Sequence, residues 1–211
     1  MKQGILFDLD GTLWDSGEGV AESWNEALAQ LGEKERVTTE DIHGVMGKTM
    51  ADIARLLFPR DEFAESMRIM DYCANCENEY LRVHGGTLYD GLKDVLSALK
   101  KAGFFLAIVS NCQKGYIEAF LEHHRLAEYF DDTENYGRTG QGKAYNIRLL
   151  KDRNHLDRAW YVGDTMGDYE ATVEAGLPFI HAAYGFGTVP EGTPAVRDLR
   201  ELPRLMESLR G

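Results

Sequence analysis

Continuous apolar runs alternate along this chain with segments whose apolar residues recur at helical spacing. The runs at 4–7, 104–109 and 159–162 show no alternation of polar and apolar residues, which is typical of strands buried on both faces. Segments such as 92–101 and 169–176 carry an apolar stripe and end near a glycine, as helices do. Strands that alternate with helices predict an α/β fold, in which a parallel sheet is covered by helices on both faces.

A second block of the chain lacks such strands. Residues 15–85 begin with a polar, glycine-containing stretch and then keep helical spacing, with Pro59 as an internal stop. We therefore predict two domains. Residues 1–14 and 86–211 form a core with a Rossmann-like parallel sheet, and residues 15–85 form a small all-helical domain.

The charge balance excludes several classes of partner. With 23 Lys and Arg against 35 Asp and Glu, the net charge of −12 disfavours a nucleic-acid partner, which needs a basic face. No run approaches the ~20 apolar residues of a membrane helix. The apolar run after Lys2 is interrupted by Asp8 too early for a secretory signal. We expect no membrane partner and a cytoplasmic location, which also suits the three sparse cysteines.

Polar side chains follow the predicted strands at the point where each strand ends. Asp8 and Asp10 close the first strand, and Asp164 and Asp168 follow the strand at 159–162. The carboxyl ends of parallel strands meet at one edge of a sheet, so we expect these carboxylates in one crevice. Clustered oxygen ligands without histidine or thiolate favour Mg²⁺. The alternative, that Asp164 and Asp168 only stabilise a helix N-terminus, does not explain two acidic pairs at two strand ends.

The same crevice is expected to hold groups suited to a phosphate. Gly11 allows backbone N–H groups to approach an anion closely, and Thr12 adds a hydroxyl. Ser110 and Asn111 follow the strand at 104–109. Because the net charge of the chain repels anions at long range, a phosphate must be attracted by local groups such as a metal ion, a lysine or helix N-termini.

Four segments in this order resemble the four motifs of the haloacid dehalogenase (HAD) superfamily: DLDGT at 8–12, VSN at 109–111, Lys143, and GDTMGD at 163–168. The resemblance covers the whole chain, because the block at 15–85 is similar to the helical cap that phosphoglycolate-phosphatase-like members insert after the first motif. It implies a Mg²⁺-dependent phosphatase that hydrolyses a small-molecule phosphate ester. Phosphoglycolate is the default substrate by this resemblance, and sugar phosphates, nucleotides and pyrophosphate stay open.

The resemblance also implies a role for each motif residue. Asp8 attacks phosphorus and forms an aspartyl-phosphate, while Asp10 protonates the leaving oxygen and then activates water. Asp8, Asp164 and the backbone carbonyl of Asp10 bind Mg²⁺, and Asp168 orients the waters of the metal. The groups expected to hold the phosphoryl oxygens are Gly11, Thr12, Ser110, Asn111 and Lys143.

Other functions match parts of the pattern. Asp10 argues against a dehalogenase or a phosphonate hydrolase, since those relatives lack this aspartate, but a phosphomutase of the β-phosphoglucomutase type would keep it. The segment GRTGQGKA at 137–144 matches the spacing of a P-loop and suggests a nucleotide kinase. Ala144 lacks the hydroxyl that would bind Mg²⁺ there, and residues 129–136 look too polar for the buried strand that precedes a P-loop. We therefore favour the phosphatase.

Within the cap, HGVMGKTM at 43–50 is the segment most typical of a site. Gly44 and Gly47 bend a predicted loop between two helices, and Lys48 offers a cation. An ordinary helix–helix turn with a solvated lysine is the alternative. Because caps like this one place such a loop over the active site, we predict that Lys48 helps to select the substrate. The chain is expected to act as a monomer or a homodimer.

Overall fold

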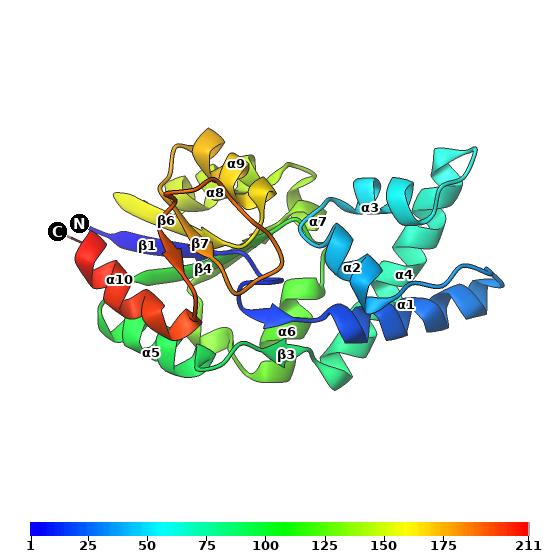
Figure 1. Ribbon diagram of the computed structural model, residues 1–211, viewed down its shortest axis with the longest axis horizontal. Helices are drawn as coiled ribbons and strands as arrows, with labels where there is room; N and C mark the ends of the chain where they lie inside the picture. The colour runs from blue at the N-terminus through cyan, green and yellow to red at the C-terminus, as the bar shows by residue number, and fades with distance from the viewer. Residues whose placement is uncertain (211) are drawn as a thin grey trace.

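The computed structural model of the protein describes residues 1–210 and has an α/β fold. Its centre is a six-stranded, fully parallel sheet with the strand order β5-β4-β1-β6-β7-β8 (Figure 1). The strands are β1 Gln3–Phe7, β4 Phe105–Ser110, β5 Asp132–Asn135, β6 Arg158–Gly163, β7 Phe179–Ala182 and β8 Ala195–Val196. The predicted fold class is confirmed.

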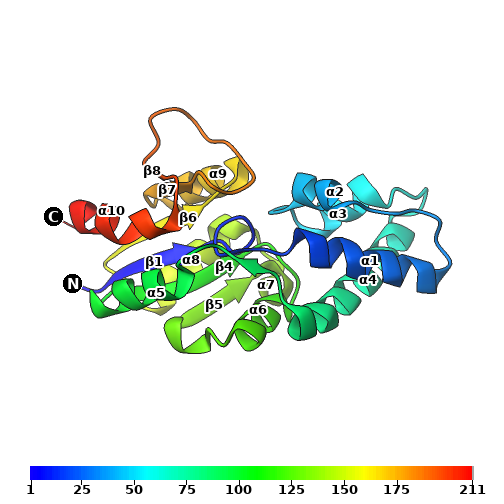
Figure 2. The same cartoon turned by 60° about the horizontal axis from the view of Figure 1, so that its bottom comes forward.

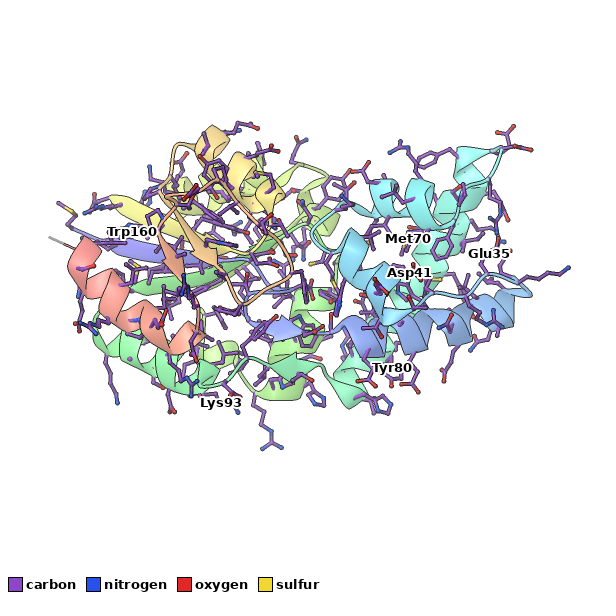
Figure 3. The ribbon with its side chains drawn as sticks, in the orientation of Figure 1. Glu35, Asp41, Met70, Tyr80, Lys93 and Trp160 are labelled. Atoms are coloured by element: carbon purple, nitrogen blue, oxygen red, sulfur yellow. The ribbon has the colours of Figure 1, made fainter. Side chains whose placement is uncertain are left out.

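Helices cover both faces of this sheet (Figure 2). Alternate residues of β1 define the two faces, because Ile5 and Phe7 belong to one apolar cluster and Leu6 to the other. Trp160 of β6 is buried in the first cluster (Figure 3). The helices on the Ile5 face are α5 Leu92–Lys101, α6 Tyr116–His124 and α10 Leu202–Leu209, and those on the Leu6 face are α8 Lys143–Arg153 and α9 Met166–Ala175.

The helices of the cap lie beside the sheet (Figure 1). They are α1 Gly17–Leu31, α2 Thr39–Val45, α3 Met50–Leu57 and α4 Phe63–His84. The chain enters and leaves the cap through a two-stranded antiparallel ribbon of β2 Trp14–Asp15 and β3 Thr87–Leu88. Met70 of α4 is fully buried among the cap helices (Figure 3). The cap and one face of the core share one apolar cluster, while the division of the chain into two domains stays a prediction.

The two edge strands of the sheet were not predicted from the sequence. β8 has only two residues, and β5 has the polar sequence DTEN, because an edge strand is paired on one side only. A strand therefore does precede the segment at 137–144, but it is a polar edge strand of which only two residues are buried. The short helix α7 Tyr136–Thr139 still separates β5 from Gly142, so the segment does not form the direct strand-to-helix loop of a P-loop.

Two short 3₁₀ helices, η1 Ala127–Tyr129 and η2 Leu199–Glu201, complete the described elements. Within residues 1–210, no helix combines the length and the apolar character that crossing a membrane requires.

Candidate active site

The loop after β1 turns back on itself. Leu13 N–H donates to Leu9 O at 2.8 Å, and Gly11 N–H donates to Trp14 O at 2.9 Å. Gly11 has a φ of +74°, and a Cβ at this position would collide with the carboxylate of Asp164, so glycine is required here. The turn thus packs the end of β1 against the end of β6. The Gly11 N–H, which was expected to approach an anion, is used inside the turn.

Lys143, the first residue of α8, joins two carboxylates. Its Nζ donates to Oδ1 of Asp8 at 2.7 Å and to Oδ1 of Asp168 at 2.5 Å. The three side chains are at most 3% exposed. Burial lowers the pKa of Lys143, but the charges of Asp168 and Asp8 outweigh burial and raise the pKa above its usual range. A charged ammonium is therefore fixed beside Asp8 at neutral pH.

Three buried carboxylates meet at the ends of β1 and β6. Asp8, Asp164 and Asp168 each place one oxygen within 4.8 Å of the others. Burial and the charge of Asp168 raise the pKa of Asp8 well above its usual value and that of Asp164 to about 7. Oδ1 of Asp164 is buried and has no hydrogen-bond partner in the described part of the chain. Three acids against one lysine, with an unpartnered carboxylate oxygen, fit a hard divalent cation such as Mg²⁺.

Asp168 differs from the other two acids because the protein occupies both of its oxygens. Oδ1 accepts from Lys143, and Oδ2 accepts from the backbone N–H and the hydroxyl of Thr165 at 3.0 and 2.6 Å. The Asp168 N–H in turn donates to Thr165 Oγ1 at 3.2 Å, which closes a capping box at the start of α9. Asp168 is thereby less suited than Asp164 to bind a cation directly.

The side chain of Asp10 is held by a separate set of hydrogen bonds. Its Oδ1 accepts from Trp14 Nε1 at 2.9 Å, from Ser16 Oγ at 2.9 Å and from the Tyr116 hydroxyl at 2.7 Å. Burial raises the pKa of Asp10, and these three donors partly oppose that rise. All three bonds end on Oδ1, so they orient the carboxyl and leave Oδ2 to exchange a proton.

The other residues predicted to bind phosphate differ in whether their side chains already form hydrogen bonds. Ser110 is buried at the end of β4, where its Oγ accepts from Cys112 N–H at 3.3 Å. Asn111 donates from Nδ2 to the backbone oxygen of Gly47 in the cap at 2.9 Å. Oγ1 of Thr12 and Oδ1 of Asn111 are buried without a hydrogen-bond partner within residues 1–210.

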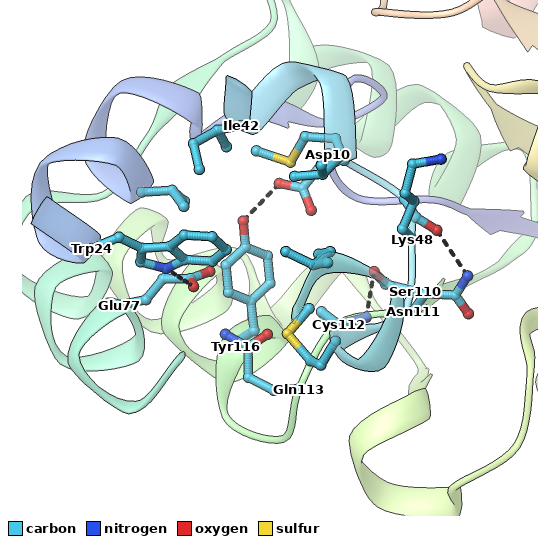
Figure 4. A pocket seen from close by; sticks show the side chains of 16 residues that line it. Asp10, Trp24, Ile42, Lys48, Glu77, Ser110, Asn111, Cys112, Gln113 and Tyr116 are labelled. Atoms are coloured by element: carbon cyan, nitrogen blue, oxygen red, sulfur yellow. Dashed lines mark hydrogen bonds between the residues drawn. The ribbon is translucent and has the colours of Figure 1, made fainter. Parts of the chain in front are cut away.

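A cavity lies between the core and the cap and has about 410 Å³ of empty space, part of it open to solvent. Asp10, Ser110 and Asn111 line it from the core, and Lys48 lines it from the cap (Figure 4). Lys48 lies in the loop between α2 and α3, as predicted, where Gly47 adopts a φ of +79°, whereas Gly44, which was expected in this loop, lies within α2. The figure places Lys48 at the same end of the cavity as Ser110 and Asn111.

A second contact between cap and core runs through the loop after β7. Phe186 N–H donates to Oδ2 of Asp164 at 2.8 Å, and the Phe186 ring stacks on His43 of α2 with centroids 4.4 Å apart. His43 also pairs with Asp15 at 2.9 Å. The Asp164 carboxylate is thus oriented by a residue that touches the cap.

Several residues of the site were not predicted from the sequence. One of them is Thr165, which the sequence could have identified, because Thr-x-x-Asp at 165–168 is a helix-capping pattern. Tyr116, Glu77 and Trp24 line the same cavity as Asp10. They come from three different helices, so no local spacing identifies them.

The chain is similar to proteins of known family. A family model described as haloacid dehalogenase-like hydrolase matches residues 5–182. Phosphoglycolate phosphatase of Aquifex aeolicus is 32% identical over 188 residues, which cover 86% of this chain and 85% of that protein. The protein named "Phosphoglycolate phosphatase, plasmid" from Cupriavidus necator is 28% identical over 217 residues, 98% of this chain and 94% of the relative. The crystal structure of a predicted phosphatase from Clostridium acetobutylicum covers 99% of both chains, with a TM-score of 0.80 and 25% identity.

Proposed function

The chain belongs to the haloacid dehalogenase-like hydrolase family, and we propose that this phosphatase is Mg²⁺-dependent and works through an aspartyl-phosphate on Asp8. Its substrate is a small-molecule phosphomonoester. The observation that carries the proposal is the position of Asp8, which is buried beside the Lys143 ammonium and within a cluster of carboxylates. A buried carboxylate held by one oxygen presents its other oxygen as a nucleophile.

In this mechanism Lys143 orients Asp8 for attack on phosphorus. Its bond to Oδ1 leaves Oδ2 to form the new P–O bond as the bond to the ester oxygen breaks. Lys143 and Ser110 then hold the phosphoryl oxygens while negative charge develops on them. Asp8, Asp164 and the backbone carbonyl of Asp10 would hold Mg²⁺, and its positive charge would offset the repulsion between the carboxylates and the phosphate.

Asp10 moves the proton in both halves of the reaction. Burial raises the pKa of Asp10 above its ordinary value, which favours the protonated carboxyl, so Oδ2 can give a proton to the leaving alcohol. The resulting carboxylate then takes a proton from the water that attacks the phosphorus of the aspartyl-phosphate. Asp8 and inorganic phosphate are released, and Asp10 ends the cycle protonated, as it began.

The cap contacts support exclusion of bulk water from this chemistry. The bond from Asn111 to Gly47 and the stacking of Phe186 on His43 hold the cap loop over the ends of β4 and β6. A covered site strengthens the electrostatic interactions around the phosphoryl group and limits the size of the substrate. We further propose a cytoplasmic location, which the sparse, free cysteines support, and a monomeric or homodimeric enzyme.

The test is phosphate release from a panel of phosphomonoesters and pyrophosphate by the purified protein. The panel begins with phosphoglycolate, because the names of the relatives suggest it. We expect release from at least one monoester with Mg²⁺, none in excess chelator, and none from Asp8→Asn. Activity that survives chelator, or that Asp8→Asn retains, would contradict the proposal.

A further inference from the structure

The cavity between core and cap has two chemically different ends. Figure 4 shows Ser110, Asn111 and Lys48 at one end and Glu77 with Trp24 at the other. Asp10 and Tyr116 lie between these two groups. The phosphoryl group belongs at the Ser110 end, so a leaving group that starts beside Asp10 extends toward Glu77.

Glu77 is the unusual residue of the far end. Its side chain sits in α4, is 4% exposed, and accepts one hydrogen bond on Oε2 from Trp24 Nε1 at 2.6 Å. Burial, together with the charge of Asp10, raises the pKa of Glu77 to about 8, while the side chains of Trp24 and Gln113 oppose the rise, and no cation is among these influences. A buried acid without a cationic partner is destabilising, and one bond from an indole N–H would be met equally well by a glutamine.

The surroundings of Glu77 limit what it can bind. Figure 4 places Trp24 and Ile42 at this end, and Val20, Met50 and Ile53 are among the other apolar residues that line the cavity. In such a setting one acid fixes the orientation of a ligand, because an ammonium or hydroxyl that meets it gains a strong hydrogen bond, whereas a carboxylate would lose its hydration without gaining a cationic partner. Lys48 lies at the opposite end and is not placed to neutralise an anion near Glu77.

Building on the proposed function, we propose that Glu77 selects substrates whose leaving group ends in a hydrogen-bond donor, either a hydroxyl or an ammonium, and rejects those that end in a carboxylate. Oε2 stays with Trp24, and Oε1 accepts from the donor. The reaction is unchanged, since Glu77 touches the far end of the leaving alcohol and takes no part in phosphoryl transfer. Glu77 is therefore a specificity-determining residue.

A matched series of small esters tests this inference. The probes are 2-hydroxyethyl phosphate, phosphoethanolamine, propyl phosphate and phosphoglycolate, which differ at the end of the leaving group. The wild type is compared with Glu77→Gln, which keeps the acceptor for Trp24, and with Glu79→Gln, an exposed control on the same helix. p-Nitrophenyl phosphate and Asp8→Asn serve as reference substrate and reference variant.

Two of the probes, 2-hydroxyethyl phosphate and phosphoethanolamine, end in a hydrogen-bond donor. For the wild type we expect the larger of their two kcat/KM values to exceed that for phosphoglycolate by about tenfold or more. The ratio of the two donor esters identifies which donor is preferred. Glu77→Gln should lower kcat/KM for phosphoethanolamine and leave the values for phosphoglycolate and propyl phosphate within about twofold. Glu79→Gln should keep the wild-type order.

Two results would overturn the inference. One is a wild type that hydrolyses phosphoglycolate as well as the donor esters. The other is a Glu77→Gln variant that changes all four esters by the same factor, which indicates a structural role only. If the four esters are inert but p-nitrophenyl phosphate is hydrolysed with dependence on Asp8, the inference fails and the proposed function stands. Failure of every ester, p-nitrophenyl phosphate included, contradicts both.

Discussion

The burial of Glu77 makes a quantitative prediction about stability that is independent of any substrate. The folded protein holds the pKa of Glu77 at about 8, against an ordinary value of 4.5. Between these values the folded state binds a proton that the unfolded state has released. The contribution of Glu77 to the free energy of unfolding is therefore fully present below pH 4.5 and is lost as the pH rises toward 8.

The size of the effect follows from the same two pKa values. Each pH unit between them changes the free energy of unfolding by about 1.4 kcal/mol, so raising the pH from 5.5 to 8.5 should remove about 3 kcal/mol. Glutamine does not titrate, and its amide oxygen can still accept the hydrogen bond from Trp24 Nε1. The free energy of unfolding of Glu77→Gln should therefore not fall by this amount. Other buried acids with raised pKa values, Asp164 and Asp10 among them, change both proteins in the same direction.

The assay is urea unfolding of wild type, Glu77→Gln and Glu79→Gln at pH 5.5 and 8.5 in the presence of chelator. The advantage of the wild type over Glu77→Gln should shrink by about 3 kcal/mol between the two pH values, while Glu79→Gln tracks the wild type. A difference between wild type and Glu77→Gln that does not change with pH would refute the assignment of a raised pKa to Glu77.

Further predictions concern the acids and the cap loop. Asp164→Ala should raise the Mg²⁺ concentration needed for half-maximal activity more than Asp168→Ala does, and the opposite order would reverse their proposed roles. Asp8→Asn should leave the thermal unfolding temperature in chelator unchanged or raise it. The substitution removes one negative charge from the acidic cluster, while Lys143 keeps its hydrogen bond to Asp168. A clear drop in the unfolding temperature would contradict this expectation. The position of Lys48 at the Ser110 end of the cavity favours a contact with the phosphoryl group over the substrate selection expected from the sequence, so Lys48→Ala should raise KM a few-fold for every phosphate ester. A loss confined to esters with an anionic leaving group would instead support leaving-group selection by Lys48.

The central part of the fold could be predicted from the sequence because its inner strands are recognisable as apolar runs. β1, β4 and β6 are apolar runs, since neighbouring strands and helices bury them on every side. β5 and β8 lie at the sheet edges, where polar or very short strands suffice, and their residues do not differ from loop sequence.

The sequence predicted those parts of the candidate site whose residues are brought together by the strand topology alone. Parallel strands end at one edge, so the proximity of Asp8 and Asp164 follows from their places after β1 and β6. Tyr116 and Glu77 reach the cavity only through the packing of α6 and α4 against the core and each other. Nothing in the local sequence of either helix distinguishes these two residues from ordinary helix residues.

In the proposed mechanism Asp8 carries the phosphoryl group during turnover. The most direct test is to quench the wild type in acid while it hydrolyses an active phosphomonoester with Mg²⁺, and to analyse its peptides by mass spectrometry. We expect one added phosphoryl group on the peptide that contains Asp8, and neither adduct nor turnover in Asp8→Asn. Turnover by the wild type without any adduct, together with an active Asp8→Asn, would contradict this mechanism.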